Sequence, residues 1–194
     1  MKALYLSIFV LLAAVSATAQ IRPVESLPIA VNYSKTIHLI FPSAVKYSQA
    51  VTDFVAVDNP ENVPHILRIK ANSKSFSKQT TVSVATEGGF FYSFNVSYAD
   101  SLEQTNYFLP DMRSIAPDTV FINEVSQTHL IAPEKVIYID YGDTCINVSK
   151  AENTENIIRM IARSGRVQQF PKQTNVSFAT ESGRFFTFNV DYRE

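Results

Sequence analysis

The chain has 194 residues, with 17 Lys and Arg against 18 Asp and Glu, so its formal net charge is −1. This near-neutral balance argues against a nucleic-acid-binding protein, which needs a basic face to displace counterions from phosphates. Hydrophobic residues make up 46% of the sequence and charged residues 18%, so the chain is too apolar to be disordered. The single cysteine, Cys145, excludes an internal disulfide and a cysteine-rich zinc site.

The N-terminus has the pattern of a signal peptide. Lys2 gives a positive start, residues 3–15 are uncharged and mostly apolar, and residues 17–19 (ATA) have the small-x-small form that signal peptidase recognises. The alternative is a membrane anchor, but a spanning helix needs about 20 apolar residues and this stretch is shorter. We therefore predict export with cleavage before Gln20, which leaves 175 of the 194 residues.

The rest of the chain contains an internal repeat. Residues 78–98 and 172–192 are identical at 14 of 21 positions. At an offset of 91 instead of 94, residues 38–42 (HLIFP) match residues 129–133 (HLIAP), and the three extra residues of the second copy fall in the loop at 163–168. The chain is therefore predicted to hold two copies of one module.

Each copy is predicted to be a series of short β-strands, because runs of β-branched and aromatic residues alternate with turn-forming Pro, Asn, Asp, Ser and Gly. In the first copy the predicted strands are 29–31, 36–41, 44–47, 54–57, 65–71, 80–85 and 90–98. About seven strands per copy favour an all-β chain of two tandem immunoglobulin-like β-sandwich modules. The predicted boundaries are a first module over 20–100, a linker over 101–116 and a second module over 117–194.

The last strand of each module shows the clearest alternation of side chains, and its two faces can be assigned. In the first copy Phe90, Tyr92, Phe94, Val96 and Tyr98 are predicted to point into the core, as are Phe186, Phe188, Val190 and Tyr192 in the second. The preceding turn carries Gly89 or Gly183, which supplies the positive φ of a tight hairpin.

The linker carries the apolar run Tyr107-Phe108-Leu109, which a freely moving linker would not need. Two alternatives follow from it. The run either packs against a module or forms an edge strand.

The sequence shows no dense catalytic or metal-binding pattern. His38 and His129 are equivalent, but no carboxylate or cysteine repeats beside them at ligand spacing, so we interpret them as structural strand residues. Cys145 aligns with Phe54 and is predicted to be a buried core residue, with a reactive or intermolecular thiol as the alternative. Since the nucleophile-elbow, phosphate-loop and zincin motifs are absent, we predict a non-enzymatic protein with no cofactor and no metal.

Three repeated pairs of residues are predicted to face outward from the strands. They are Arg68 with Arg159, Phe91 with Phe185, and Asn95 with Asn189. Because Phe and Arg are favoured at interfaces, the six residues are a candidate protein-interaction face. The simpler interpretation is a solvated arginine whose stem covers apolar surface and a phenylalanine that packs on a neighbouring loop.

Three segments of the first copy carry a recognisable pattern: residues 35–47 (KTIHLIFPSAVKY), residues 61–71 and the hairpin that ends at Val96. These segments resemble the TraN family of transfer proteins from Bacteroidetes conjugative transposons. The resemblance is to the N-terminal module of TraN; it covers residues 28–98 well and the second copy, residues 119–192, more loosely. The resemblance implies a secreted, non-enzymatic envelope component of a conjugation apparatus, related to the type IV secretion machinery.

Two functions from different classes follow from these observations. The first is a periplasmic or outer-membrane-associated structural subunit that contacts envelope proteins, conjugation-apparatus proteins or a second copy of itself. The second is a tandem β-sandwich that binds a surface glycan or another extracytoplasmic ligand, which would require an aromatic platform on exposed strands. Neither function involves nucleic acid or a membrane-spanning segment.

Overall fold

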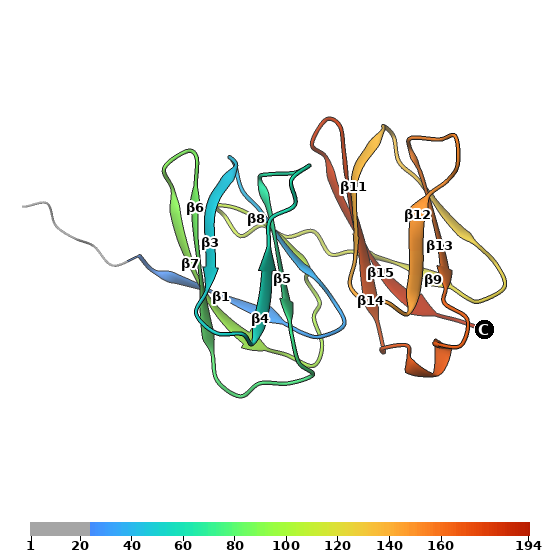
Figure 1. The fold of residues 1–194 in the computed structure, drawn as a ribbon, viewed down its shortest axis with the longest axis horizontal. Coiled ribbons are helices and arrows are strands. Elements are labelled where there is room, and N and C mark those ends of the chain that lie inside the picture. The colour runs from blue at the N-terminus through green and yellow to red at the C-terminus, as the bar shows by residue number, and fades with distance from the viewer. Residues whose placement is uncertain (1–23) are drawn as a thin grey trace, which may run out of the picture.

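The described part of the chain, residues 24–194 of a computed structural model, consists of β-strands joined by turns and loops (Figure 1). It contains one short 3₁₀ turn, Val167–Gln169. The predicted signal peptide, residues 1–19, lies outside the described residues.

The first module and the linker contribute eight strands. These are β1 (Ser26–Val31), β2 (Ile37–Ile40), β3 (Val45–Ala50), β4 (Val55–Asp58), β5 (Ile66–Ala71), β6 (Thr80–Thr86), β7 (Phe91–Tyr98) and β8 (Asn106–Phe108). The second module contributes seven. These are β9 (Asp118–Ile122), β10 (Thr128–Ile131), β11 (Val136–Tyr141), β12 (Ile146–Lys150), β13 (Ile157–Ala162), β14 (Thr174–Thr180) and β15 (Phe185–Tyr192). The seven strands predicted for the first copy are all present.

Each module is a sandwich of two sheets. In the first module the sheet β1-β7-β6-β3 packs on the sheet β4-β5-β2-β8, and in the second the sheet β9-β15-β14-β11 packs on β10-β13-β12. The shared core of the first module contains residues from both sheets, for example Leu39, Leu67, Val82 and Phe94. The prediction of an all-β chain with two tandem sandwich modules is confirmed.

The two modules repeat each other in strand pairing, residue by residue. His38 pairs with Arg68 across β2 and β5, and His129 pairs with Arg159 across β10 and β13. The bulge in β3, between Val45 and Tyr47, recurs in β11 between Val136 and Tyr138. Cys145 directly precedes β12 as Phe54 precedes β4, so the alignment of Cys145 with Phe54 holds in the structure.

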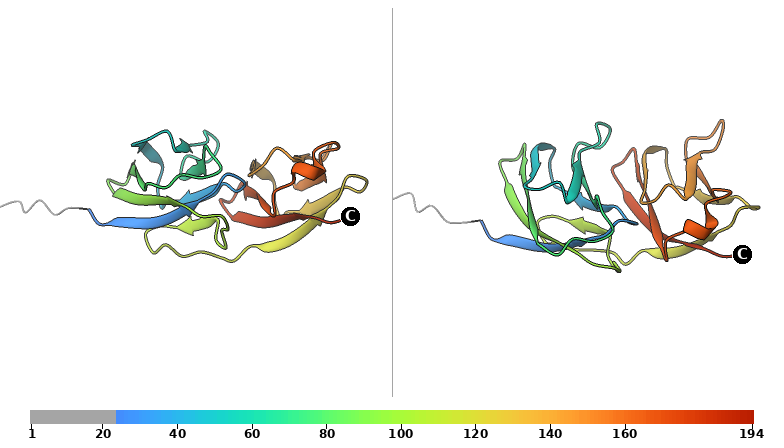
Figure 2. Two further views of the ribbon diagram at one scale, coloured as in Figure 1. Left: turned by 90° about the horizontal axis from the view of Figure 1, so that it is seen from below. Right: turned by 60° about the horizontal axis from the view of Figure 1, so that its bottom comes forward.

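In both modules the first strand lies parallel to the last strand. β1 pairs with β7 over six residues and β9 pairs with β15 over five. Figure 2 shows β1 beside β7 at one end of the molecule and β9 beside β15 at the other. Parallel pairing of the first and last strands means that the chain enters a module at one end of this strand pair and leaves it at the other.

The final hairpin follows the predicted alternation with one exception. Gly89 and Gly183 have φ of 79° and 81°, as the tight turns require, and Tyr92, Phe94 and Val96 are buried. The prediction that Phe90 points into the core is wrong: its side chain is exposed. Phe90 lies in the turn before β7 begins, and the two-residue alternation of a strand does not extend into a turn.

The linker forms an edge strand, one of the two predicted alternatives. β8 pairs in parallel with β2, opposite His38, Leu39 and Ile40, and Leu109 packs in the first core. The linker thus completes the second sheet of the first module before the chain crosses to the second module.

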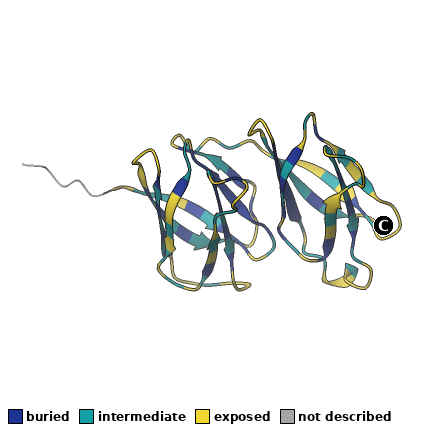
Figure 3. Cartoon of the chain, turned by 45° about the horizontal axis from the view of Figure 1, so that its top comes forward, coloured by how far each residue is buried: buried dark blue, intermediate teal, exposed yellow. Residues whose placement is uncertain are grey.

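The four sheets follow one another along the long axis of the molecule (Figure 1), and the second module stacks on the first. The strands at this junction are more buried than their counterparts elsewhere. All seven residues of β14 are buried, whereas in β6 buried and half-buried residues alternate. All four residues of β2 are buried, whereas none is buried in β10. Figure 3 shows buried positions on these strands and exposed positions in the turns.

Candidate functional site

The centre of the junction between the modules is apolar. Ile40 and Ile66, from β2 and β5, pack against Tyr138 and Ala179, from β11 and β14. The His38 ring lies 5.0 Å from the ring of Phe185, centroid to centroid. We call this surface, with the polar contacts described next, the module junction. Its apolar centre excludes water, so the polar groups around it must find partners within the protein.

An arginine links the modules at the edge of this apolar centre. Arg68 donates from Nη1 to Asp140 Oδ1 of the second module at 2.6 Å, and from Nη2 to Asp58 of its own sheet. His38 Nε2 lies 3.1 Å from the Tyr138 hydroxyl and 3.4 Å from Asp140 Oδ2. Burial raises the pKa of Asp140, but the close approach of His38 and the charge of Arg68 outweigh burial and lower it below its usual value.

A buried lysine makes a second polar link. The Lys35 ammonium donates to Leu102 O at 2.9 Å, to Gln173 Oε1 at 2.6 Å and to Asn189 Oδ1 at 2.9 Å. Burial lowers the pKa of Lys35, and the charge of Asp191 partly offsets this effect. The lysine joins the first module to the linker and to β15.

The backbones of the two modules approach each other closely at a third place. The Asn175 side chain bonds both backbone groups of Thr36, accepting from its N–H at 3.0 Å and donating to its C=O at 2.9 Å. Thr174 Oγ1 donates to Ser34 O at 2.7 Å. Gly142 lies against the same atoms and accepts a hydrogen bond from Lys70. Lys70, Gly142 and Asn175 thus hold the modules at a close, fixed distance.

Three of the six candidate interaction residues contact the other module. These are Arg68, which binds Asp140, Phe185, which packs on His38, and Asn189, which accepts from Lys35. Their counterparts lie at the two ends of the molecule: Phe91 is exposed, Asn95 is half-buried, and Arg159 donates to Ser149 of its own sheet. The repeat therefore places one set of these residues in the module junction and the other set on outer faces.

Lys35 and Asp140 were missed at the sequence level because they do not repeat. Their counterparts in the other copy are Ser126 and Gln49. Tyr138 does repeat, as Tyr47, and this signal could have identified it.

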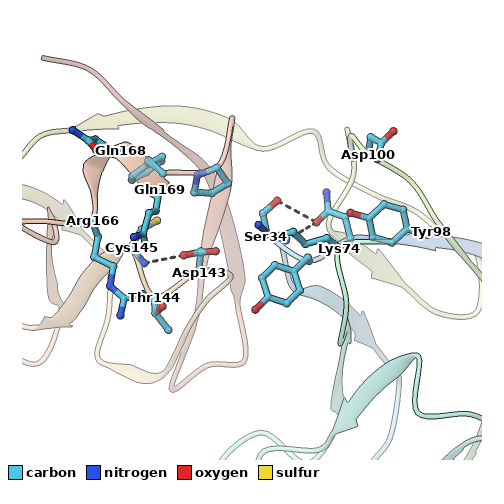
Figure 4. A pocket seen from close by; sticks show the side chains of 14 residues that line it. Ser34, Lys74, Tyr98, Asp100, Asp143, Thr144, Cys145, Arg166, Gln168 and Gln169 are labelled. Carbon is cyan, nitrogen blue, oxygen red and sulfur yellow. Dashed lines mark hydrogen bonds between the residues drawn. The ribbon is translucent and has the colours of Figure 1, made fainter. Parts of the chain in front are cut away.

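A cleft of about 780 Å³ opens beside the junction, between the two modules. Figure 4 shows Tyr98 and Asp100 on the side of the first module, facing Asp143, Cys145 and Arg166 on the other. Burial raises the pKa of the Cys145 thiol to about 12, and the charge of Asp143 adds to this effect. The thiol is therefore protonated at neutral pH, and a thiol is a weak nucleophile.

Within residues 24–194 no group of three or more His, Cys, Asp or Glu side chains is arranged to hold a metal ion. The same part of the chain contains no helix that is long and apolar enough to cross a membrane.

A protein-family model described as "Domain of unknown function (DUF8473)" matches the chain twice, over residues 29–102 and 120–194. The chain belongs to the DUF8473 family. Its two DUF8473 domains correspond to the two sandwich modules, except that β8 lies outside both matches. The first match extends to Leu102, whose carbonyl accepts from Lys35. No curated protein matches the chain significantly.

Several solved structures share a weak overall likeness with the two DUF8473 domains. A titin structure (Titin-A168169) has a TM-score of 0.26 at 11% identity, with 88% of this chain and 97% of that chain covered. The protein SGBP-B from the Bacteroides ovatus mixed-linkage glucan utilization locus, in complex with a heptasaccharide, has a TM-score of 0.24 at 10% identity, with 91% and 46% covered. Protocadherin Gamma C5 EC1-3 has a TM-score of 0.27 at 10% identity, with 87% and 66% covered. Likeness at this level supports no conclusion about function.

Proposed function

We propose that this protein is an exported, non-enzymatic structural subunit of the cell envelope that acts through protein–protein contacts. The observation that best supports this proposal is that two aromatic side chains are exposed on the outer sheet of the first module. Tyr47 on β3 and Phe91 on β7 are both about half exposed. Exposed aromatic side chains grouped on a sheet face are typical of surfaces that bind another protein. The resemblance to the TraN family supports a more specific proposal, in which the subunit belongs to a conjugation apparatus in the periplasm or at the outer membrane.

The proposal is tested by deleting the gene and measuring transfer of a mobile element from the mutant cells. We expect transfer to be lost and to return with the wild-type gene. When the deletion strain receives the Phe91→Asp gene instead, transfer should stay low, because a charge at position 91 makes the sheet face unsuitable for contact with a partner. Wild-type transfer from the deletion strain would contradict the assignment to a conjugation apparatus.

Cross-linking in cells, followed by purification from envelope extract, tests the broader claim of a structural subunit. We expect defined envelope proteins to be cross-linked to the wild-type chain and to be depleted with Phe91→Asp. The matched control is Ile115→Asp, an exposed apolar residue of the linker, which should leave the cross-links unchanged. A chain without any cross-linked envelope protein would contradict the proposal.

The cleft between the modules favours a second candidate function, binding of a surface glycan. It carries Tyr33 and Tyr98 together with polar and charged groups such as Asp100, Asp143 and Arg166. Aromatic rings with convergent polar groups are common in ligand sites.

Calorimetric titration with envelope oligosaccharides should show binding that Tyr33→Ala abolishes and Tyr141→Ala leaves intact. Both tyrosines are similarly exposed, at 41% and 39%, but only Tyr33 lines the cleft. Absence of binding would rule this function out.

A further inference from the structure

We propose that the protein docks head-to-tail on a second copy of itself. The outer face of the β10-β13-β12 sheet of one molecule packs on the outer face of the β1-β7-β6-β3 sheet of the next. The new contact thereby repeats the module junction between two molecules. This inference rests on the proposed function through protein contacts and names the partner as the same chain.

The first argument is that the residues at the centre of the module junction exist a second time, on both of its sides. On one side His38, Ile40 and Arg68 have the counterparts His129, Ile131 and Arg159, which are identical residues in the same strand register. On the other side Tyr138, Ala179 and Phe185 have the counterparts Tyr47, Ala85 and Phe91, also identical. The molecule thus carries both partners of its own internal contact on separate surfaces.

The second argument is burial. Within one molecule the junction leaves Ile40 8% exposed and Tyr138 7% exposed, whereas the counterparts Ile131 and Tyr47 are 74% and 46% exposed. Val51, Phe91 and Val125 are further large exposed apolar side chains on or beside these two outer faces. Each face therefore carries exposed apolar side chains, set among polar ones, that the rest of the described chain does not cover.

The third argument is geometry. The two uncovered faces belong to the first and the last of the four stacked sheets and lie at opposite ends of the long axis (Figure 1). They are different surfaces, so the contact is heterologous. A heterologous contact continues from molecule to molecule and builds a row or a closed ring of copies.

The contact between molecules differs from the module junction at several polar positions. Ser126 replaces Lys35 and Thr81 replaces Asn175, so those links are not repeated. In the module junction Asp140 accepts a hydrogen bond from Arg68. The counterparts of these two residues are Gln49 and Arg159, so the contact between molecules has no carboxylate at this position to pair with Arg159. Val51 and Val125 stand at the positions of Gly142 and Ser34, where the two backbones come closest. The contact is therefore wider and more apolar at that edge, and it is weaker than the junction within one chain.

Sedimentation velocity over a wide range of concentrations tests the proposal directly. We expect the purified protein to associate reversibly at high micromolar concentration, and Ile131→Asp to weaken association by at least about tenfold, or about 1.4 kcal/mol. Because Ile131 is exposed, the variant should fold normally, which circular dichroism checks. Ile115→Asp is the matched control and should associate as the wild type does.

Mixing two variants separates a head-to-tail contact from any other. Ile131→Asp blocks only the face on the second module, and Phe91→Asp blocks only the face on the first. Each alone should be monomeric, and an equal mixture should form dimers but nothing larger. A mixture that stays monomeric while the wild type associates would overturn the head-to-tail arrangement.

A gain of affinity provides a test that does not depend on disrupting the protein. Gln49→Asp supplies the carboxylate that Asp140 supplies within the molecule, so it should tighten association roughly two- to fivefold. The gain should vanish in combination with Arg159→Met, as a double-mutant cycle would measure.

If wild type and Gln49→Asp are both monomeric at every concentration, the inference is wrong. If, in that case, the Ile131→Asp chain still forms cross-links to envelope proteins, the proposed function stands and only the inference of self-association is rejected.

Discussion

At the scale of single residues, the module junction depends on a few buried polar groups whose partners lie in the other module. Lys35 is 3% exposed and His38 is fully buried, and Asp140 is nearly so. Burying such groups is unfavourable unless hydrogen bonds or opposite charges compensate for the lost water. Each of them therefore makes the stability of one module depend on contact with the other.

Replacing Lys35 by alanine should destabilise the protein by roughly 2–3 kcal/mol, because the buried carbonyl oxygen of Leu102 and the half-buried side-chain oxygens of Gln173 and Asn189 lose their donor. Urea denaturation followed by tyrosine fluorescence measures the change. The exposed Lys78 is the control, and Lys78→Ala should change the free energy of unfolding by less than about 0.5 kcal/mol. Equal stability of the two variants would show that the Lys35 contacts contribute nothing.

Stability should fall in acid through Asp140. Its pKa is lowered in the folded protein, against about 3.9 in the unfolded chain. The contribution is therefore fully present above about pH 4 and is lost as the pH falls through the lower, folded value. Urea denaturation at a series of acidic pH values should show this loss in the wild type and a smaller loss in Asp140→Asn. Identical pH profiles for the two proteins would contradict the assignment.

At the scale of secondary-structure elements, strand positions were predictable and strand environments were not. The β-branched runs and the Gly89 turn correctly indicated the strands of the final hairpin. The burial of β14 on both faces was not predictable, because its counterpart β6 has nearly the same sequence but one open face. An internal sequence repeat identifies only the residues that the two modules share. The junction uses different residues in the two modules, for example Asp140, whose counterpart is Gln49, so these residues could be recognised only in the structure.

The turn after β11 should be intolerant of any side chain at Gly142. A Cβ there would lie 2.5 Å from Asn175 Oδ1 and 2.8 Å from Thr174 Oγ1, and it would also strike the Ser34 carbonyl. We expect Gly142→Ala to destabilise the protein by about 1–3 kcal/mol, since the backbones must move apart.

The matched control is Gly88→Ala, where the nearest atom is the Ser43 hydroxyl at 2.9 Å, on a side chain that can rotate away. Thermal unfolding of both variants measures the difference. A Gly142→Ala protein that unfolds at the wild-type temperature would show that the close approach is not needed.

At the scale of the whole molecule, the two modules should unfold as one unit. The module junction combines an apolar centre with an ion pair and a buried lysine. Separating the modules therefore exposes the apolar centre and takes both Arg68 and His38 away from Asp140. Domains coupled in this way lose their structure together.

Ile40→Asp should uncouple the modules, because it places a charge in the apolar centre of the junction. Calorimetry should show one transition for the wild type and two for this variant. Ile131→Asp is the same change at the same position of the other repeat, on an exposed side chain, and it should retain a single transition at low concentration. One transition in both variants would show that the modules do not depend on each other through this contact.

The parallel pairing of first and last strands has a mechanical consequence for each module. A pull on the two ends of a module acts along β1 and β7, or along β9 and β15, in opposite directions (Figure 2). Because the strands are parallel and adjacent, such a force slides them past each other and loads all the hydrogen bonds of the pair at once, instead of peeling them apart one by one. Each module thus resists stretching along the direction of its own first and last strands.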